Sequence, residues 1–251
     1  MKTPNALSKI GAIARRVLRQ IRGNRRFSVA MLVIPIAILF LLKVVFDALE
    51  VPSVAQRRFA VLGVAYLIHF VAFLLTALVV VGERVQGTLG RMFIAGYRRG
   101  EIVAGYLVSY TIFATVQGGI VLAVAYGLFD LGYDIAELAQ IFLVVWLLAV
   151  FMMALGILVS STARNEVQVI PFVPAILVPA LFLSGMVVDV RRFPTWAQVL
   201  ARFTPLYYAV EVFGGFFSVG SVFSDVGSFL LLPSLAVVVF GVAALTLREE
   251  R

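Results

Sequence analysis

The chain holds few residues that could do chemistry on their own. It has no cysteine and one histidine, His69, which excludes thiolate catalysis and metal sites built from several histidines or cysteines. An ATP-binding loop needs a glycine directly before its lysine, and none of the lysines follows a glycine. The motifs His-Glu-x-x-His and Gly-x-Ser-x-Gly are absent as well. We therefore predict no catalytic residue, no metal site and no cofactor bound by this chain.

Two polar side chains inside apolar stretches are candidates for lining a path through the protein, His69 and Gln117. Ionisable groups inside membrane segments often mark routes for protons or substrates. We expect His69 to be either a neutral ring that is hydrogen-bonded between helices or a proton-coupling or substrate contact. No pair of carboxylates lies within the apolar stretches, so neither an ion-driven carrier nor a membrane aspartyl protease is supported.

The segments that carry these residues are long and apolar. The chain is 62% hydrophobic and 14% charged, with a mean hydropathy of +1.05, and one soluble core could not bury so much apolar surface. A membrane-spanning helix needs about 20 apolar residues. We predict an all-α membrane protein, a single domain over residues 1–251, with six transmembrane helices at 27–46, 59–82, 102–129, 138–159, 167–188 and 226–247.

The fifth of these segments contains Pro171, Pro174 and Pro179. Proline is tolerated in a membrane helix when neighbouring groups bond the carbonyls that it frees. We therefore expect this span to be kinked or broken.

The basic residues are distributed unevenly. The net charge is +8, and most of the 21 lysines and arginines lie before the first span, in the second and fourth loops, and after the last span. The positive-inside rule then places both termini in the cytoplasm of a multi-pass plasma-membrane protein. The basic excess thus indicates topology and contact with membrane lipids, and no nucleic-acid partner is predicted.

Residues 8–22 form a separate basic element before the first span. Apolar residues recur there at helical spacing on one side, and the other side is rich in lysine and arginine. This pattern predicts an amphipathic helix in the headgroup plane. It is expected to serve as a membrane anchor, and the helix could also pack beside the first span and touch a cytoplasmic partner.

The second loop, residues 82–102, is apolar and basic in alternation. Leu89, Met92 and Phe93 have the spacing of a short helix, and four arginines surround them. Thr88 and Glu101 could supply capping contacts. From these residues alone, the loop is either a basic interfacial loop or a surface helix that lies across the membrane face.

The fifth loop, residues 189–225, is too aromatic for a solvated loop, and this composition predicts short helices at the outer interface.

Four motifs in order resemble one family. Glu83-Arg84-x-x-Gly87-Thr88-Leu89 follows the second span, and Ser184-Gly185 lies near the end of the fifth. Phe193-Pro194-Thr195-Trp196 and Pro205-Leu206-Tyr207-Tyr208 lie beyond the fifth span. Together they resemble the permeases of type-2 ATP-binding-cassette exporters. In length, the chain is similar to the drug-resistance and polysaccharide-export subgroups of that family. The chain departs from that pattern at Gly96 and Tyr106, near positions where many members carry proline and lysine.

The resemblance implies roles for these residues. The second loop would hold a coupling helix that docks into a separate ATPase subunit, through Glu83, Arg84, Gly87, Thr88, Leu89, Arg91, Met92 and Phe93. Leu89, Met92 and Phe93 would supply the apolar contact, and Glu83 and Arg84 would form ion pairs at that interface. Arg164 and Glu166 would make a second cytoplasmic contact. Re-entrant helices would form an outer gate with Ser184, Gly185, Phe193, Pro194, Trp196 and Pro205.

The implied protein is a homodimeric, prokaryotic exporter permease, with ATP and Mg²⁺ bound only by its partner ATPase. An apolar path favours amphipathic, lipid-like or drug-like cargo, and a lipid-linked glycan or polysaccharide, or sodium ions, are the alternatives. The alternatives of another class are a membrane enzyme and a non-transporting accessory subunit.

Overall fold

The computed structural model describes residues 5–163 and 165–246, and all regular secondary structure within them is helical. Six helical segments are long and apolar enough to cross a membrane, which confirms the six predicted spans. Most extend a few residues beyond the predicted limits, because polar residues continue the helices past the apolar segments. They are α2 (Arg25–Ala48), α3 (Ser53–Val85), α5 (Arg99–Phe129), α6 (Ile135–Ser160), α7 (Glu166–Val169) with α8 (Phe172–Leu183), and η2 (Val222–Asp225) with α11 (Val226–Thr246).

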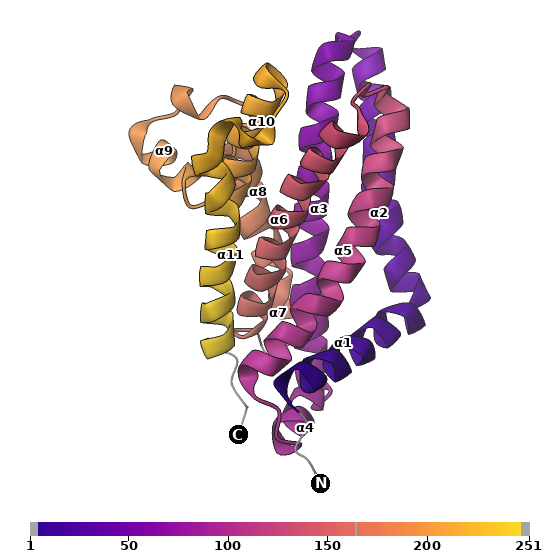
Figure 1. Ribbon diagram of the computed structural model, residues 1–251, viewed down its shortest axis with the longest axis vertical. Coiled ribbons are helices and arrows are strands. Elements are labelled where there is room, and N and C mark those ends of the chain that lie inside the picture. Colours follow the sequence, from indigo (N-terminus) through magenta and orange to yellow (C-terminus); the bar gives the residue numbers. More distant parts are fainter. Residues whose placement is uncertain (1–4, 164, 247–251) are drawn as a thin grey trace.

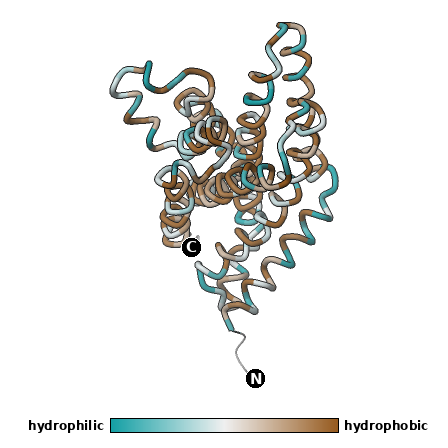
Figure 2. Tube along the Cα trace, turned by 45° about the horizontal axis from the view of Figure 1, so that its top comes forward, coloured by the Kyte–Doolittle hydropathy of each residue, from teal (hydrophilic) through white to brown (hydrophobic). Residues whose placement is uncertain are grey.

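These segments form an elongated bundle with two distinct ends (Figure 1). At one end, here the α4 end, lie the short helix α4 (Thr88–Ile94), the start of α1 (Ala6–Gly23) and the end of α11. At the opposite α10 end lie the α2–α3 and α5–α6 connections with η1 (Val190–Arg192), α9 (Thr195–Ala201) and α10 (Pro205–Val219). Apolar residues dominate the upright helices between the two ends, whereas α1 carries many hydrophilic positions (Figure 2).

The centre of the bundle is the crossing of α3 and α6, the most extensively packed pair of helices. A Cβ added at Gly156 of α6 would lie 2.8 Å from the Phe73 carbonyl oxygen of α3 and would overlap the Thr76 hydroxyl. Only glycine permits such a close approach of two helix backbones, as small residues do at many membrane helix interfaces. By contrast, α2, the α7–α8 segment and α11 are mostly uncovered within this chain.

Two proline breaks shape the outer helices. The fifth span is broken as predicted, because α7 ends at Val169 and α8 begins at Phe172, directly after Pro171. In α2, Pro35 has no N–H to donate to the Met31 carbonyl one turn earlier. The side-chain amide of Gln117, on α5, donates a hydrogen bond to that carbonyl at 2.8 Å. Gln117 therefore satisfies a proline-freed backbone group, and its expected role in lining a path stays a prediction.

The N-terminal helix is present but is covered differently from our expectation. Its apolar residues Ile13, Ala14, Val17 and Ile21 are buried, and α1 packs mainly on α5 and much less on α2. A Cβ added at Gly105 of α5 would lie 2.6 Å from Ile13 Cγ2, so the two helices touch where glycine leaves room. Protein, and not a headgroup layer, thus covers most of this apolar side.

Candidate functional site

The candidate site is the turn between α3 and α4 together with the groups that hold it. Gly87 separates the two helices with a φ of +67°, a left-handed conformation that favours glycine. Gly96 adopts a φ of +80° directly after α4 and reverses the chain toward α5. The loop therefore bends at two glycines, and the short helix between them lies across the α4 end of the bundle (Figure 1).

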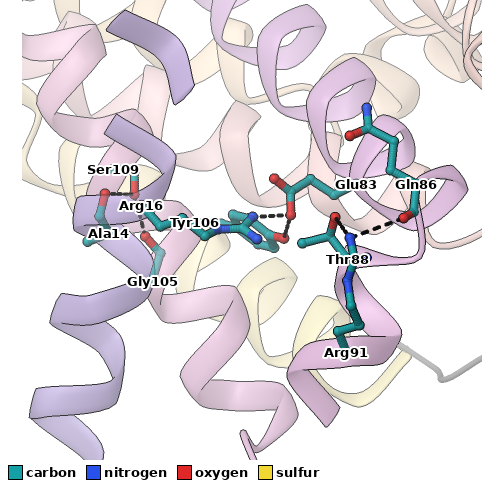
Figure 3. Close-up of polar contacts among 9 residues, drawn as sticks. All are labelled: Ala14, Arg16, Glu83, Gln86, Thr88, Arg91, Gly105, Tyr106 and Ser109. Atoms are coloured by element: carbon teal, nitrogen blue, oxygen red, sulfur yellow. Dashed lines mark hydrogen bonds and ion pairs between the residues drawn. The ribbon is translucent and has the colours of Figure 1, made fainter. Parts of the chain in front are cut away.

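Glu83, in the last turns of α3, is the centre of this site. Its carboxylate is buried, with the side chain 3% exposed, and it forms an ion pair and hydrogen bond with Arg16 of α1. The Tyr106 hydroxyl of α5 donates a second hydrogen bond to the same carboxylate oxygen at 2.9 Å. Three helices thus converge on one carboxylate (Figure 3). A buried carboxylate needs such partners, because without them its desolvation would be very costly.

Arg84 connects the same turn to the far end of α6. Its Nη1 donates hydrogen bonds to the carbonyl oxygens of Ser161 and Ala163, each at 3.1 Å. These carbonyls follow the last turn of α6, where no helical N–H is available to them. The α3–α4 turn is therefore fastened to α1, α5 and the end of α6 by two consecutive side chains.

Lys9 of α1 fastens the other end of the α4 loop. Its ammonium donates to the Gly96 carbonyl at 2.8 Å, lies 3.5 Å from the Glu101 carboxylate, and stands 5.6 Å from the centre of the Tyr97 ring. Glu101 also accepts a hydrogen bond from the Arg98 backbone N–H at 2.8 Å, which caps the start of α5. Helix α1 therefore contacts the loop both before and after α4.

The exposed surface of the loop differs from our expectation. Leu89 and Met92 are buried against the bundle, and Phe93 is partly buried, so Leu89 and Met92 are not free to contact a partner in this conformation. The large exposed apolar residues here are Ile94, at 84% exposure, and Val85, at 60%. Arg91 is exposed beside them and donates hydrogen bonds to the Gln86 carbonyl and the Thr88 hydroxyl (Figure 3).

The predicted second contact is only partly described. Arg164 lies outside the described residues. Glu166 begins α7 and is exposed, and its carboxylate lies over Gly82, where an added Cβ would come within 2.9 Å of Oε1. A polar cavity of about 210 Å³ lies here, lined by Gln20, Gln86 and Glu166 among others.

The residues of the predicted outer gate gather at the α10 end, far along the bundle from α4. Ser184 is buried, and its hydroxyl donates to the Leu181 carbonyl at 2.8 Å. Gly185 has a φ of +87° and turns the chain out of α8. Pro194 precedes α9, Pro205 begins α10, Phe193 lies between η1 and α9, and Trp196 is 66% exposed on α9.

His69 lies in the middle of α3 and is fully buried. Its ring stacks on that of Tyr66, with centroids 6.1 Å apart, and neither ring nitrogen has a hydrogen-bond partner among the described residues. The interhelical hydrogen bond that we expected is therefore not formed. Among the described residues, the packing of α3 brings no hydrogen-bond partner to the imidazole, and a role for His69 in a path stays a prediction.

Sequence reasoning missed Arg16, Lys9 and Tyr106 as members of the site. Arg16 and Lys9 belonged to a basic face in which no single residue stands out, and only the fold brings them to Glu83 and to Gly96. Tyr106 was noted as a departure from the family pattern, and this departure was a usable signal, because Tyr106 supplies a partner to Glu83.

Hydrogen bonds and an ion pair join the site across α1, α3, α5 and α6. Within the described ranges, no three His, Cys, Asp or Glu side chains are grouped to hold a metal ion. An apolar cavity of about 390 Å³ opens between α5, α6 and α11, and its lining contains Leu107, Leu147 and Phe240. Force applied to α4 would reach α1, α3, α5 and α6 through the contacts described above.

These features define the protein as a multi-pass helical membrane protein. The chain matches the family described as ABC-2 type transporter over residues 8–218, and it belongs to that family. The family is a membrane component of transport systems.

Known relatives agree with this assignment. The chain is 27% identical over 162 residues to the probable multidrug ABC transporter permease YbhR of Escherichia coli, covering 64% of this chain and 44% of YbhR. It is 25% identical over 166 residues to the linearmycin resistance permease protein LnrN of Bacillus subtilis, covering 66% and 43%. ABC transporter G family member 20 of Dictyostelium discoideum is 28% identical over 192 residues, 75% of this chain and 26% of that protein. The chain thus spans less than half the length of these relatives.

Proposed function

We propose that this chain is the transmembrane subunit of an ATP-driven exporter in a prokaryotic plasma membrane, with its α4 end in the cytoplasm. A separate ATP-binding-cassette subunit would bind ATP and Mg²⁺ and hydrolyse the nucleotide, because this sequence has no phosphate-binding loop of its own. The basic residues near the α4 end support this orientation.

The observation that carries the proposal is the fastening of the α4 loop to four helices. Glu83 joins α3 to α1 and α5, Arg84 joins it to the end of α6, and Lys9 holds the loop beyond α4. A partner that pushes on α4 would therefore move the bundle as a connected unit, as a transducing element requires. A loop that only covered the surface would not need this set of hydrogen bonds and ion pairs.

The surface of α4 that meets the ATPase subunit would be made by its exposed residues. Ile94 and Val85 would supply the apolar contact, and Arg91 would add charge at the rim. Leu89 and Met92 would hold α4 on the bundle instead. Glu166, with Arg164 beside it in the sequence, would form the smaller second contact at the start of α7.

The cargo is proposed to be amphipathic, lipid-like or drug-like. The names of YbhR and LnrN refer to multidrug and linearmycin resistance, respectively. The apolar cavity between α5, α6 and α11 is of a size that suits an alkyl chain or a drug fragment. Two copies of the chain would face each other, and the helices α9 and α10, with the gate residues, would close the path at the outer leaflet.

The test is ATP hydrolysis and assembly with the ATPase subunits encoded beside this chain, measured in lipid. The decisive variant is Ile94→Asp, which places a charge on the exposed face of α4. The matched control is Ile135→Asp, the same substitution at a residue of similar exposure, 87%, at the opposite end of the bundle. We expect Ile94→Asp to lose complex formation or most of the ATPase rate, and Ile135→Asp to retain both.

Two results would overturn the proposal. One is that none of these ATPase subunits binds the wild-type chain, which would favour an accessory protein without transport activity. The other is that Ile94→Asp and Ile135→Asp assemble and hydrolyse ATP equally well, since the α4 surface would then have no coupling role.

A further inference from the structure

A second site lies at the α10 end of the bundle, away from the α4 loop. A cavity of about 430 Å³ opens there between the start of α3, the α5–α6 connection and α10. Its lining includes two adjacent arginines, one carboxylate and three aromatic rings: Arg57, Arg58, Glu137, Tyr133, Phe216 and Phe217. None of these residues belongs to the predicted coupling or gate sites.

Arg58 is the cation that remains without an acidic partner. Its guanidinium carbon lies 5.4 Å from the centre of the Phe217 ring, and it forms no ion pair within the described part of the chain. Arg57 is paired with Asp130 at 3.3 Å, but that carboxylate is 94% exposed, and the buried Arg57 Nε has no hydrogen-bond partner among the residues that the structure describes. A guanidinium stacked on an aromatic ring keeps its N–H fork free to bind an anion in its plane.

The other groups of the cavity are compatible with an anion. Glu137 accepts a hydrogen bond from the Asp134 N–H at 2.8 Å and is thereby engaged in capping α6. Burial, followed by the nearby Glu137 carboxylate, raises the pKa of Tyr133. The Tyr133 hydroxyl therefore keeps its proton at neutral pH and can donate a hydrogen bond. The rings of Tyr133 and Phe216 meet edge to face at 5.3 Å and form an apolar wall beside the arginines.

The depth of the two arginines indicates where an anion would come from. They directly precede Phe59, the first residue of the apolar stretch 59–82 of α3. The length of that stretch, about 36 Å at 1.5 Å per residue, matches the hydrocarbon layer with a small excess. Arg57 and Arg58 therefore lie at the depth of lipid headgroups, where phosphate groups are abundant and free anions are dilute.

We propose that Arg57 and Arg58 bind the phosphate of an anionic phospholipid headgroup, with Tyr133, Phe216 and Phe217 covering the adjoining glycerol region.

Arg58 also borders a neighbouring cavity of about 540 Å³ whose lining includes Asp189, Glu211 and Asp225. Asp189 and Asp225 are engaged as helix caps, accepting hydrogen bonds from the Arg191 and Ser228 N–H groups. The site requires no ATPase subunit, so its test is independent of the proposed export function.

The experiment uses the full chain, purified in a non-ionic detergent and titrated with dihexanoyl phosphatidylglycerol, with bound lipid counted by native mass spectrometry. A dihexanoyl glycolipid without phosphate and inorganic phosphate alone serve as comparison ligands. We expect the phospholipid to bind more tightly than the glycolipid. Arg58→Gln should weaken phospholipid binding roughly tenfold, as for a lost charge-assisted hydrogen bond. Arg58→Lys, which keeps the charge without the planar fork, should give an intermediate loss.

The control variant is Arg202→Gln, which removes an exposed arginine from the C-terminus of α9 at the same end of the bundle. It should bind phospholipid as the wild type does. Because Arg58 is exposed, Arg58→Gln should also melt at the wild-type temperature without lipid, which separates lost binding from misfolding. Equal phospholipid affinity in Arg58→Gln and wild type would overturn the site. Displacement of the lipid by inorganic phosphate at equal concentration would assign the site to free phosphate and overturn the lipid assignment.

Discussion

Tyr106 donates its hydroxyl hydrogen to the Glu83 carboxylate across 2.9 Å and thereby joins α5 to the last turns of α3. Arg16 completes the group from α1, so that helices from three separate parts of the sequence depend on one buried charge. The same contacts hold the α4 end together and attach the α4 loop to it, so a substitution that weakens them should both destabilise this end and loosen the loop. The first prediction follows from it.

Replacing Glu83 with Gln should destabilise the protein more than replacing Tyr106 with Phe. Glu83→Gln leaves the Arg16 guanidinium without its counter-charge, and because Arg16 is 37% exposed we expect a moderate loss of about 1–3 kcal/mol. Tyr106→Phe removes one hydrogen bond and should cost about 1 kcal/mol. Thermal unfolding in detergent measures both. The control Asp47→Asn breaks the more exposed Lys43–Asp47 pair and should change stability much less than Glu83→Gln. Equal losses in Glu83→Gln and Asp47→Asn would contradict the central role of Glu83.

The contact between Ile13 and Gly105 gives a prediction with a built-in rescue. Gly105→Ala places a methyl group 2.6 Å from Ile13 Cγ2 and should displace α1 at a cost of about 1–3 kcal/mol. Adding Ile13→Ala should recover part of this loss, because Cγ2, the nearer of the two overlapping Ile13 atoms, is then absent, whereas Cβ at 2.7 Å remains. Gly119→Ala on the same helix is the control, since a Cβ there meets no atom within 4 Å. Protease sensitivity of α1 reports its displacement, and a Gly105→Ala chain as resistant as Gly119→Ala would disprove the close contact.

Gln117 and Pro35 should be energetically coupled. Gln117→Leu leaves the Met31 carbonyl without its donor and should cost about 1 kcal/mol in the wild type, as for membrane hydrogen bonds generally. In a Pro35→Ala background, residue 35 regains an N–H that can bond this carbonyl within α2. The cost of Gln117→Leu should therefore shrink toward zero in that background. A double-mutant cycle of unfolding measures the coupling, and strict additivity would argue against it.

The proposed homodimer can be tested directly because the chain contains no cysteine. We expect a single cysteine at Val178, exposed on α8, to cross-link two copies with a short bismaleimide in membranes. A cysteine at Val237, exposed on α11, should give monomer only. Efficient cross-linking at Val237 with none at Val178 would place the interface elsewhere.

The six spans could be predicted from the sequence because the requirement for about 20 apolar residues leaves little freedom. The prolines likewise predicted the break between α7 and α8. The contacts of the candidate site could not be predicted. Lys9 and Arg16 look like any other residues of a basic helix face, and only the docking of α1 on α5 brings them to Gly96 and Glu83.

The sequence also did not show which side of the short helix α4 packs against the bundle. Leu89 and Ile94 are both apolar residues of α4, and helical spacing alone does not show which of them packs inward. The fold decides this, because the tight turn at Gly87 directs Leu89 toward the bundle and leaves Ile94 outside. The contact of Gln117 was hidden for a related reason, since its partner is a backbone carbonyl of α2 that Pro35 leaves without its usual donor.

The docking of α1 on α5 has a consequence for how the protein is made. During synthesis α1 emerges before its binding surface, because Gly105 and the rest of α5 follow only after α2, α3 and α4. Until then the apolar residues of α1 are not covered by α5, and we expect this basic amphipathic helix to lie on the membrane surface. On this reasoning lipid would be the temporary partner of α1 in the nascent chain, and α1 would move onto α5 once the third span has been inserted.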